Sequence, residues 1–264
     1  MVFSAIREPV IRRAVIPLAD WPQGAPGLRL VFLADIHVAG PDMPPERFDE
    51  IIGQVNRLSP DIVLIGGDFV SDRRTSTSRY PAELAIRPLA KLRPSLGTVA
   101  VLGNHDHWRN SAAITEALAA AGVRVLLNDA LTIGPLRIGG VDDAFTGRAD
   151  IPRTEAAMRL GGGARIMLSH SPDVAPNVSE EVGLLLAGHT HCGQIRLLGI
   201  GAVSTMSDYG ERFACGRTSK GRLRIITTGG LGTSILPLRL GTRPELWLVE
   251  VGPLSSPQRL SASP

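Results

Sequence analysis

The chain is poor in cysteine and in aromatic residues, and it lacks long apolar runs. With Cys192 and Cys215 as its two cysteines, the sequence implies no disulfide framework, and a reducing compartment is the default expectation. Aromatic residues make up 4% of the chain, so the core must be built from aliphatic side chains. No apolar stretch approaches the ~20 residues of a membrane-spanning helix, which predicts that this chain does not cross a bilayer.

Charge is balanced rather than extreme. The formal net charge is +3, with 20% charged and 44% hydrophobic residues, which is typical of a folded globular protein. A mild positive charge favours anionic partners in general but falls short of a nucleic-acid signature. The chain is long enough for one large α/β domain, and a second domain is not required.

Residues 1–21 mix isoleucine and valine with arginine, and Pro9 and Pro17 interrupt them. This segment has no continuous apolar region of the kind found in signal peptides. We favour a first strand packed on a sheet; the alternative is contact with an anionic membrane surface. The prediction is a cytoplasmic protein, with peripheral contact to the inner face of the membrane left open. The domain plan is a lead segment (1–26), one domain (27–252) and a flexible tail (253–264).

All six histidines lie in a set of five short motifs rich in Gly, Ser, Asp and Asn. Histidine is the commonest metal ligand, and its mixture with Asp and Asn suits Mn, Fe, Zn or Co. The sequence therefore predicts an enzyme with two metal ions. The motifs are Asp35-Ile36-His37, Gly67-Asp68, Gly103-Asn104-His105-Asp106-His107, Ser169-His170-Ser171 and Gly188-His189-Thr190-His191.

Each motif follows a short apolar run that predicts a β-strand. Because strand ends of an α/β sheet meet at one rim, ligands placed there converge. Helical spacing is seen at 48–58, after Pro44-Pro45, and at 112–121, before Gly122. The pattern favours an α/β sandwich of two sheets flanked by helices. The five runs are 28–34, 62–65, 98–102, 166–168 and 184–187, and further strands are expected at 123–127, 131–133, 136–141, 223–227 and 246–251.

Taken together and in order, the motifs resemble those of the calcineurin-like metallophosphoesterases, and every block is present between residues 35 and 191. That resemblance implies a four-layer α/β/β/α sandwich of two mixed β-sheets. It also implies a dinuclear centre at the strand ends that holds two divalent metal ions, with manganese among the candidates.

The resemblance also implies a ligand for each position. One ion would be held by Asp35, His37 and His191, and the other by Asn104, His170 and His189, with Asp68 bridging the two. The chemistry agrees, because a carboxylate has two oxygens and carries the charge that relieves repulsion between two cations. Such a pair lowers the pKa of the attacking water and clamps an in-line displacement at phosphorus.

His105 matches the family histidine that acts as general acid on the leaving oxygen; the alternative is that it only positions the phosphoryl group. In the protein-phosphatase branch, an Asp three residues after the bridging Asp pairs with this histidine. Ser71 stands at that position here, Asp72 is off by one, and Asp106 replaces a Glu. A Ser/Thr protein phosphatase is therefore disfavoured.

A narrower likeness, at 140–143, 188–195 and 230–234, is to the bacterial branch that includes cell-wall and lipid-A-precursor phosphodiesterases. Gly230-Leu231-Gly232 is either a turn or a segment whose N–H groups approach a phosphate. Cys192 stands where Gly is frequent, and we interpret it as a neutral thiol rather than an additional metal ligand.

These features predict a hydrolase of phosphodiester or pyrophosphate bonds, acting on a phosphorylated small molecule or a lipid-linked substrate. The alternatives are a catalytically silent metal-binding scaffold and a nuclease, although nucleic acid is disfavoured because no basic or aromatic track is evident. No obligate protein partner is evident. The expected substrate contacts are Asp143, Arg148, Thr233 and Ser234, with Arg73 and Arg74 on a neighbouring loop.

Overall fold

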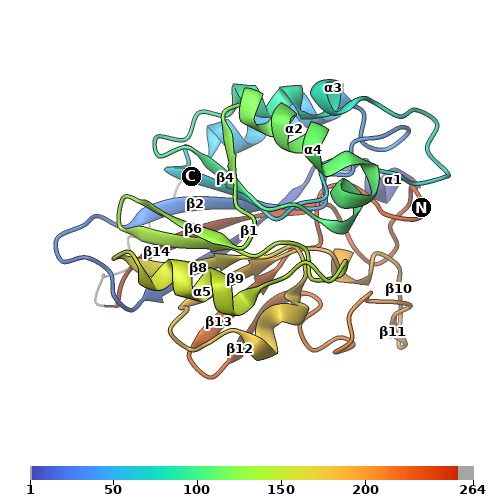
Figure 1. Ribbon diagram of the computed structural model, residues 1–264. Coiled ribbons are helices and arrows are strands. Elements are labelled where there is room, and N and C mark those ends of the chain that lie inside the picture. Colours follow the sequence, from blue (N-terminus) through green and yellow to red (C-terminus); the bar gives the residue numbers. More distant parts are fainter. Residues whose placement is uncertain (1, 255–264) are drawn as a thin grey trace, which may run out of the picture.

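The computed structural model describes the backbone of residues 2–254 and the side chains from Ser4 onward. Most of the expected flexible tail, residues 255–264, lies outside the described residues. Two β-sheets face each other, and helices cover their outer faces (Figure 1). This is the expected four-layer α/β/β/α arrangement of two mixed sheets.

The first sheet carries the strands that lead to the first three motifs. Its order is β1-β14-β2-β3-β4-β5, with β2, β3, β4 and β5 parallel to one another and β14 antiparallel to β2. The strands are β1 (Val10–Leu18), β2 (Leu28–Leu33), β3 (Ile62–Ile65), β4 (Thr98–Ala100), β5 (Val123–Val125) and β14 (Glu245–Pro253). The helices on this side are α1 (Val2–Ala5), α2 (Pro45–Arg57), α3 (Ala82–Ile86), η1 (Arg87–Lys91) and α4 (Asn104–Ala120).

The second sheet carries the strands that lead to the last two motifs. Its order is β12-β13-β9-β8-β7-β6, and a small hairpin, β10-β11, stands apart from it. The strands are β6 (Asp129–Ile133), β7 (Leu136–Gly140), β8 (Ala164–Leu168), β9 (Leu184–Ala187), β10 (Arg196–Leu197), β11 (Gly201–Ala202), β12 (Gly216–Lys220) and β13 (Leu223–Thr227). The helices here are α5 (Ile151–Arg159), η2 (Pro172–Asn177) and η3 (His191–Gly193).

Three aliphatic clusters fill the spaces between the layers. The middle cluster lies between the sheets and includes Leu30 and Leu64 of the first sheet. From the second sheet it includes Ile166, Leu168 and Leu186. The outer clusters pack α2 and α4 on the first sheet and α5 on the second. Alternate residues of each strand therefore face different clusters, and this fixes which strand ends meet.

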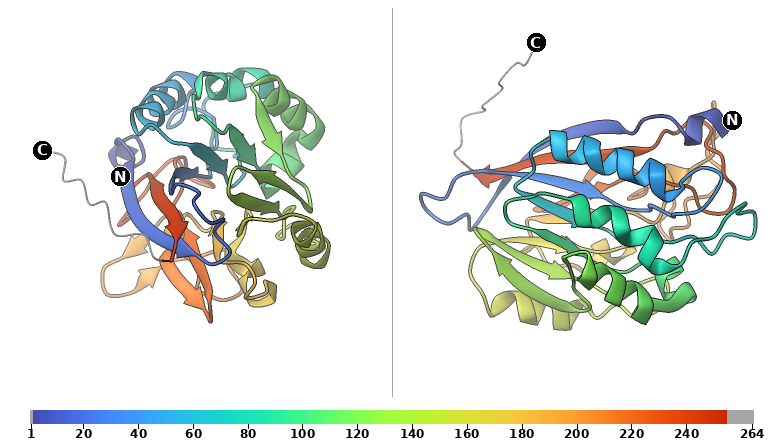
Figure 2. Two further views of the ribbon diagram at one scale, coloured as in Figure 1. Left: turned by 90° about the vertical axis from the view of Figure 1, so that its left-hand side faces the viewer. Right: turned by 90° about the horizontal axis from the view of Figure 1, so that it is seen from above.

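Residues 10–18 form the strand that the sequence favours. β1 runs parallel to β14, with Val10 opposite Glu245 and Leu18 opposite Pro253, so the first and last strands of the chain lie side by side (Figure 2). None of the helices formed by residues 2–254 combines the length and the apolar character needed to cross a bilayer.

The structure also differs from the sequence-based prediction in local features. Helix α4 starts at Asn104 rather than Ala112, so the third motif forms its first turns, and Asn110 has non-helical backbone angles within it. The hairpin β10-β11 was not predicted, because its two-residue strands are too short to show a pattern.

Candidate metal centre

Most of the residues predicted as ligands lie on turns that follow strands, and Asn104 begins α4. Five of them have φ between 49° and 68°, in the left-handed region that side chains other than glycine rarely adopt. Such backbone strain persists where the surrounding structure determines it, and it gathers at functional sites. The five residues are Asp35, His37, Asp68, His189 and His191.

Asp68 lies at the middle of the cluster. Its Oδ2 is 3.5 Å from Nε2 of His37 and 3.2 Å from Nε2 of His170, so one oxygen lies between the two halves of the predicted ligand set. Its Oδ1 accepts a hydrogen bond of 2.9 Å from the backbone N–H of His105. The side chain is buried.

Asp35, His37 and His191, which we call the Asp35 group, come together at one side of Asp68. Nε2 of His37 is 3.1 Å from Nε2 of His191, and Nε2 of His191 is 3.8 Å from Oδ1 of Asp35. The three residues offer ligand atoms that all lie within 4.8 Å of one another. Both carboxylate oxygens of Asp35 also accept the backbone N–H of His189.

Asn104, His170 and His189, which we call the His170 group, meet at the other side of Asp68. Nε2 of His170 lies 3.1 Å from Oδ1 of Asn104 and 3.1 Å from Nδ1 of His189. The remaining ring nitrogens face backbone carbonyls, Nδ1 of His170 toward Gly66 and Nε2 of His189 toward Met206. Such partners orient ligating imidazoles.

Burial and the neighbouring carboxylates set the pKa values of the candidate ligands. Burial lowers the pKa of His189 to about 3 and holds the pKa values of His37 and His191 well below the ordinary range, so these rings are neutral donors. Burial raises the pKa of Asp35 to about 7. Burial alone would lower the pKa of His170, but the Asp68 carboxylate raises it to about 10.

The donor set fits divalent metal ions. Neutral ring nitrogens of His37 and His191 face each other, beside two buried carboxyl groups, and Nδ1 of His37 has no hydrogen-bond partner within the described residues. A cation between such nitrogen and oxygen atoms relieves both the facing lone pairs and the buried negative charge. The structure thus supports metal binding here, while the number and identity of the ions are proposed below.

His105 lies at the edge of this cluster and is partly open to solvent. Its Nδ1 pairs with the carboxylate of Asp72, and its Nε2 lies 3.5 Å from Oγ of Ser234. The ring meets that of His37 edge to face, with 4.7 Å between centroids. Sequence reasoning missed Asp72 as the partner, because it lies one residue beyond the position at which the resemblance places an Asp.

Two other residues of the third motif have structural roles. The buried carboxylate of Asp106 accepts backbone N–H groups of Gly103, Asp68 and Phe69, at 3.0, 2.8 and 2.8 Å, and so joins the start of α4 to the Asp68 turn. His107 points elsewhere, since its Nε2 lies 2.7 Å from Asp142. The third motif therefore supplies a candidate ligand, a candidate general acid and two residues with structural roles.

A buried arginine that the sequence did not indicate stabilises the turn at 229–232. The Arg239 guanidinium donates to the carbonyls of Gly229 and Gly232, both at 2.6 Å, and lies 3.4 Å from Nδ1 of His191. Burial lowers its pKa to about 10. Its position, 48 residues after His191, follows no periodic pattern.

The glycines at 230 and 232 serve close packing. A Cβ on Gly230 would lie 2.4 Å from Cβ of Asp35, and one on Gly232 would lie 2.1 Å from the carbonyl oxygen of Ile36. The N–H groups of Leu231 and Gly232 donate to the backbone at 34–35. Between the two interpretations left open, the structure therefore favours a turn that supports Asp35 over a phosphate cradle.

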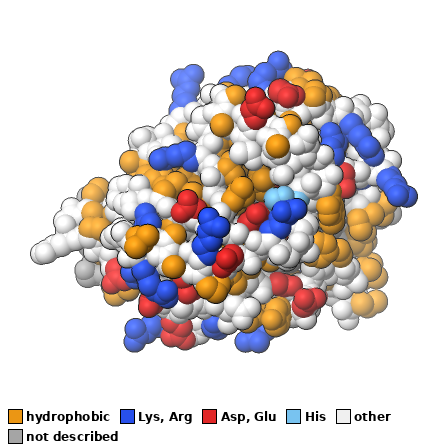
Figure 3. All heavy atoms as spheres, viewed as in Figure 1, with side chains coloured by type: hydrophobic (Ala, Val, Ile, Leu, Met, Phe, Trp, Pro, Cys, Tyr) orange, Lys and Arg blue, Asp and Glu red, His pale blue; other side chains and the backbone are white. Residues whose placement is uncertain are grey.

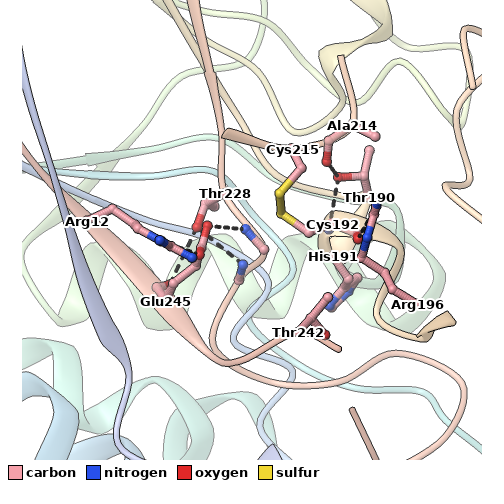
Figure 4. Close-up of a disulfide and its surroundings, with 12 residues drawn as sticks. Arg12, Thr190, His191, Cys192, Arg196, Ala214, Cys215, Thr228, Thr242 and Glu245 are labelled. Atoms are coloured by element: carbon pink, nitrogen blue, oxygen red, sulfur yellow. Dashed lines mark hydrogen bonds and ion pairs between the residues drawn. A yellow bond between two sulfur atoms is a disulfide. The ribbon is translucent and has the colours of Figure 1, made fainter. Parts of the chain in front are cut away.

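Cys192 and Cys215 form a disulfide, so the expectation of a neutral thiol is wrong (Figure 4). The bond joins the turn after His191 to the segment before β12, and Thr190 strengthens the junction by donating to the carbonyl of Ala214 at 2.6 Å. Cys192 itself has a left-handed backbone conformation. The expectation of a reducing compartment was based on unpaired cysteines, and the disulfide removes that basis.

The expected substrate contacts divide into accessible and buried residues. Ser234 lies beside His105, and Arg148 is exposed on the loop after β7. Asp143 is buried on the same loop, with Oδ2 accepting the N–H of Thr146, and is not accessible to substrate in this conformation. Arg74 is exposed.

Thr233 and Arg73 are structural rather than substrate contacts. Both are buried; Arg73 donates to the carbonyls of Thr233 and Gly40 and pairs with Asp42, and the Thr233 hydroxyl donates to Asp42 at 2.6 Å. Further hydrogen bonds stabilise a buried ion pair, and the Thr233 hydroxyl supplies one to Asp42, so neither side chain is free to contact substrate.

Two exposed aromatic rings lie at the edge of the candidate metal centre. Trp108 lies 5.0 Å from the His105 ring, Phe145 lies 4.7 Å from the His189 ring, and the two aromatic rings are 6.0 Å apart, all measured between centroids. Sequence analysis did not single them out, although Trp108 directly follows the third motif.

Two bacterial proteins are similar to the chain over most of its length. Over 244 residues the chain is 32% identical to "Phosphodiesterase YaeI" of Escherichia coli (strain K12), covering 89% of this chain and 86% of that protein. It is also 32% identical to "Uncharacterized metallophosphoesterase YkuE" of Bacillus subtilis (strain 168), covering 85% and 79% of the two chains.

A vertebrate relative is longer. The "Transmembrane protein with metallophosphoesterase domain" of Danio rerio is 32% identical over 262 residues, which are 92% of this chain, and the chain spans 57% of that relative's length. Residues 28–193 match the family described as calcineurin-like phosphoesterase. The sandwich fold and the clustered candidate ligands agree with this match, and the chain belongs to the calcineurin-like phosphoesterase family.

Proposed function

We propose that the chain hydrolyses phosphodiester or pyrophosphate bonds at a centre of two divalent metal ions. The observation that carries the proposal is the place of Asp68, with one oxygen between His37 of the Asp35 group and His170 of the His170 group. Two ions, when bound, would lower the pKa of the attacking water and neutralise charge on the phosphoryl group. Manganese, iron, zinc and cobalt all suit these ligands.

His105 would protonate the leaving oxygen. With Nδ1 paired to Asp72, the ring is held so that Nε2 faces Ser234 at the rim. The Asp72 carboxylate orients the ring, and Ser234 lies beside its reactive edge. Ser234 and the exposed Arg148 would then contact the part of the substrate beyond phosphorus.

Preference for a diester is supported by the name of the E. coli relative, a phosphodiesterase. The pairing of Asp72 with His105 suits a general acid that protonates a poor alcohol leaving group. A catalytically silent scaffold would have no need for this pair. A nuclease is less favoured, since the exposed rings at this rim, Trp108 and Phe145, form one pair rather than a track for successive bases.

The test is an assay of the metal-loaded protein against four substrates: a phosphomonoester, a phosphodiester, a nucleotide-sugar pyrophosphate and single-stranded DNA. We expect the diester or the pyrophosphate to have the highest kcat/KM, and metal analysis to give about two ions per chain. Two bound ions without turnover on any substrate would assign the chain to the scaffold class, and preference for DNA would assign it to the nucleases.

A further inference from the structure

Exposed hydrophobic side chains gather at one place on the surface. Of the sixteen large hydrophobic side chains that are exposed in the described part of the chain, nine lie between residues 197 and 240. Ile200 is 76% exposed, Ile235 68% and Val203 63%, and Leu198 is fully exposed. We call this set the apolar rim: Leu197, Leu198, Ile200, Val203, Met206, Tyr209, Ile235, Leu236 and Leu240.

The two segments that form the apolar rim are joined to each other. The Gln194 side chain donates to the carbonyls of Leu236 and Leu238, both at 3.0 Å, and the N–H of Arg196 donates to the carbonyl of Leu240 at 2.8 Å. The disulfide closes the first segment at its base. Hydrophobic side chains gather on the right-hand part of the face in Figure 3, where Figure 1 places β10 and β11, beside a histidine.

The apolar rim also borders the candidate metal centre, since the carbonyl of Met206 lies 3.1 Å from Nε2 of His189. Single exposed hydrophobic side chains are normal on a protein surface, whereas a contiguous group marks a binding surface. The group lies on the β10-β11 hairpin and on loops rather than on a helix.

The charges around the apolar rim are mainly positive. Arg212 and Arg243 are exposed on its two segments, and Arg74 is exposed beside Thr75, whose hydroxyl donates to the carbonyl of Ile235. Of the nearby acidic groups, Glu211 pairs with Arg196, and Asp208 is exposed between Met206 and Tyr209, so exposed arginines outnumber the unpaired acidic side chain. Cationic groups around an exposed apolar surface complement an anionic lipid surface, and they would repel each other across a symmetric contact between two copies of this chain.

We propose that the apolar rim docks on the surface of an anionic phospholipid bilayer, with its side chains in the boundary between headgroups and acyl chains and with Arg74, Arg212 and Arg243 among the headgroups. This differs from the membrane contact considered for residues 1–21, of which 10–18 form a strand of the first sheet. The docked orientation brings the centre that contains His189 to the level of the headgroups. The inference does not depend on the proposed hydrolysis.

The test is co-sedimentation with vesicles of phosphatidylglycerol mixed with phosphatidylcholine, and with vesicles of phosphatidylcholine alone. The wild type should bind the anionic vesicles, and raising the salt concentration should weaken this binding. Leu198→Ser/Ile200→Ser should weaken it by about tenfold or more, because binding scales with the apolar area inserted. Leu160→Ser is the matched control, since Leu160 is 87% exposed after α5 and outside the apolar rim.

A charge variant separates the electrostatic contribution to vesicle binding from the hydrophobic one. Arg212→Glu/Arg243→Glu should remove the preference for anionic over neutral vesicles. Unchanged hydrolysis of a small soluble phosphodiester, or an unchanged melting temperature, would show that each variant is folded. The proposal is overturned if the wild type binds neither kind of vesicle, or if the Leu198/Ile200 variant binds as well as the Leu160 control. A wild-type dimer that the same variant converts to monomers would assign the surface to a second copy of the chain.

Discussion

The carboxylate of Asp72 pairs with Nδ1 of His105, across 33 residues of sequence. Asp72 comes from the loop after β3 and His105 from the first turn of α4. The pair leaves Nε2 of His105 facing Ser234 at the edge of the candidate metal centre. This arrangement suits a ring that donates a proton from one defined atom, Nε2 of His105.

His105→Ala should therefore retain both metal ions and slow hydrolysis of an alkyl diester by about 10²–10⁴-fold, with a much smaller effect on a nitrophenyl diester, whose leaving group needs no proton. Asp72→Asn should show the same selectivity with a smaller loss. The measurement is kcat/KM for both substrates, with metal content checked. His107→Ala is the control, because its ring pairs with Asp142 instead. Equal losses on the two substrates would mean that His105 positions the phosphoryl group.

Asp68→Asn removes a carboxylate with one oxygen between His37 of the Asp35 group and His170 of the His170 group. We expect loss of one metal ion and of nearly all turnover, with the fold retained, because an amide cannot offset the repulsion between two cations. Elemental analysis and circular dichroism would measure the two effects. Asp129→Asn, an exposed carboxylate on β6, serves as control. A variant that held two ions per chain and kept full activity would exclude the bridging assignment.

Metal binding should release protons. With the pKa of His170 at about 10 and that of Asp35 at about 7, the metal-free protein at about pH 8 keeps the proton of His170 and has largely lost that of Asp35. A ligating imidazole must be neutral, so about one proton should leave on binding, and metal affinity should rise with pH below about 10. Calorimetry in buffers of different ionisation enthalpy would count the protons. Binding heats that do not depend on the buffer would contradict this.

The disulfide should stabilise both the fold and the turn that carries His191. Cys192→Ala/Cys215→Ala opens a loop with a sequence separation of 23. We expect a loss of about 3 kcal/mol in the free energy of unfolding, from chain entropy. Denaturant titration would measure it, and chemical reduction of the wild type should give a similar loss. Unchanged stability in both experiments would show that the packing around Thr190 and Ala214 suffices.

Arg148→Ala tests the one exposed residue among the predicted substrate contacts on the loop after β7. KM should rise for a large phosphodiester or pyrophosphate and stay constant for a small nitrophenyl diester, because contacts remote from phosphorus matter only when the remote group exists. Arg153→Ala, exposed on α5, is the control. Constant KM for every substrate would leave Arg148 a solvated side chain.

Positions at strand ends could be predicted from the sequence for a simple reason. Asp35, Asp68 and His170 each follow an apolar run that is too short for a helix and is buried in the sheet. Once those runs are taken as neighbouring strands, their ends must meet. The resemblance then gave the order of the ligands, and the structure brings all seven together.

Contacts made by irregular segments could not be predicted. The pairing of Asp72 with His105 depends on the path of one loop past Asp68. The disulfide depends on the left-handed backbone conformation of Cys192, which no sequence pattern predicts. Thr233 was misassigned because a polar residue near the rim gives no sign of being buried against Asp42. Each of these contacts is set by tertiary packing rather than by local preference.

The two ligand groups draw on both sheets. Asp35, Asp68 and Asn104 follow strands of the first sheet, and His170, His189 and His191 follow strands of the second. A chain in which either sheet is formed alone can therefore hold no complete set of donors, since Asp35 and His189 meet across 154 residues. Ions that bind both groups would therefore act as a cross-link between the two halves of the sandwich, and occupancy of the centre would report completed folding.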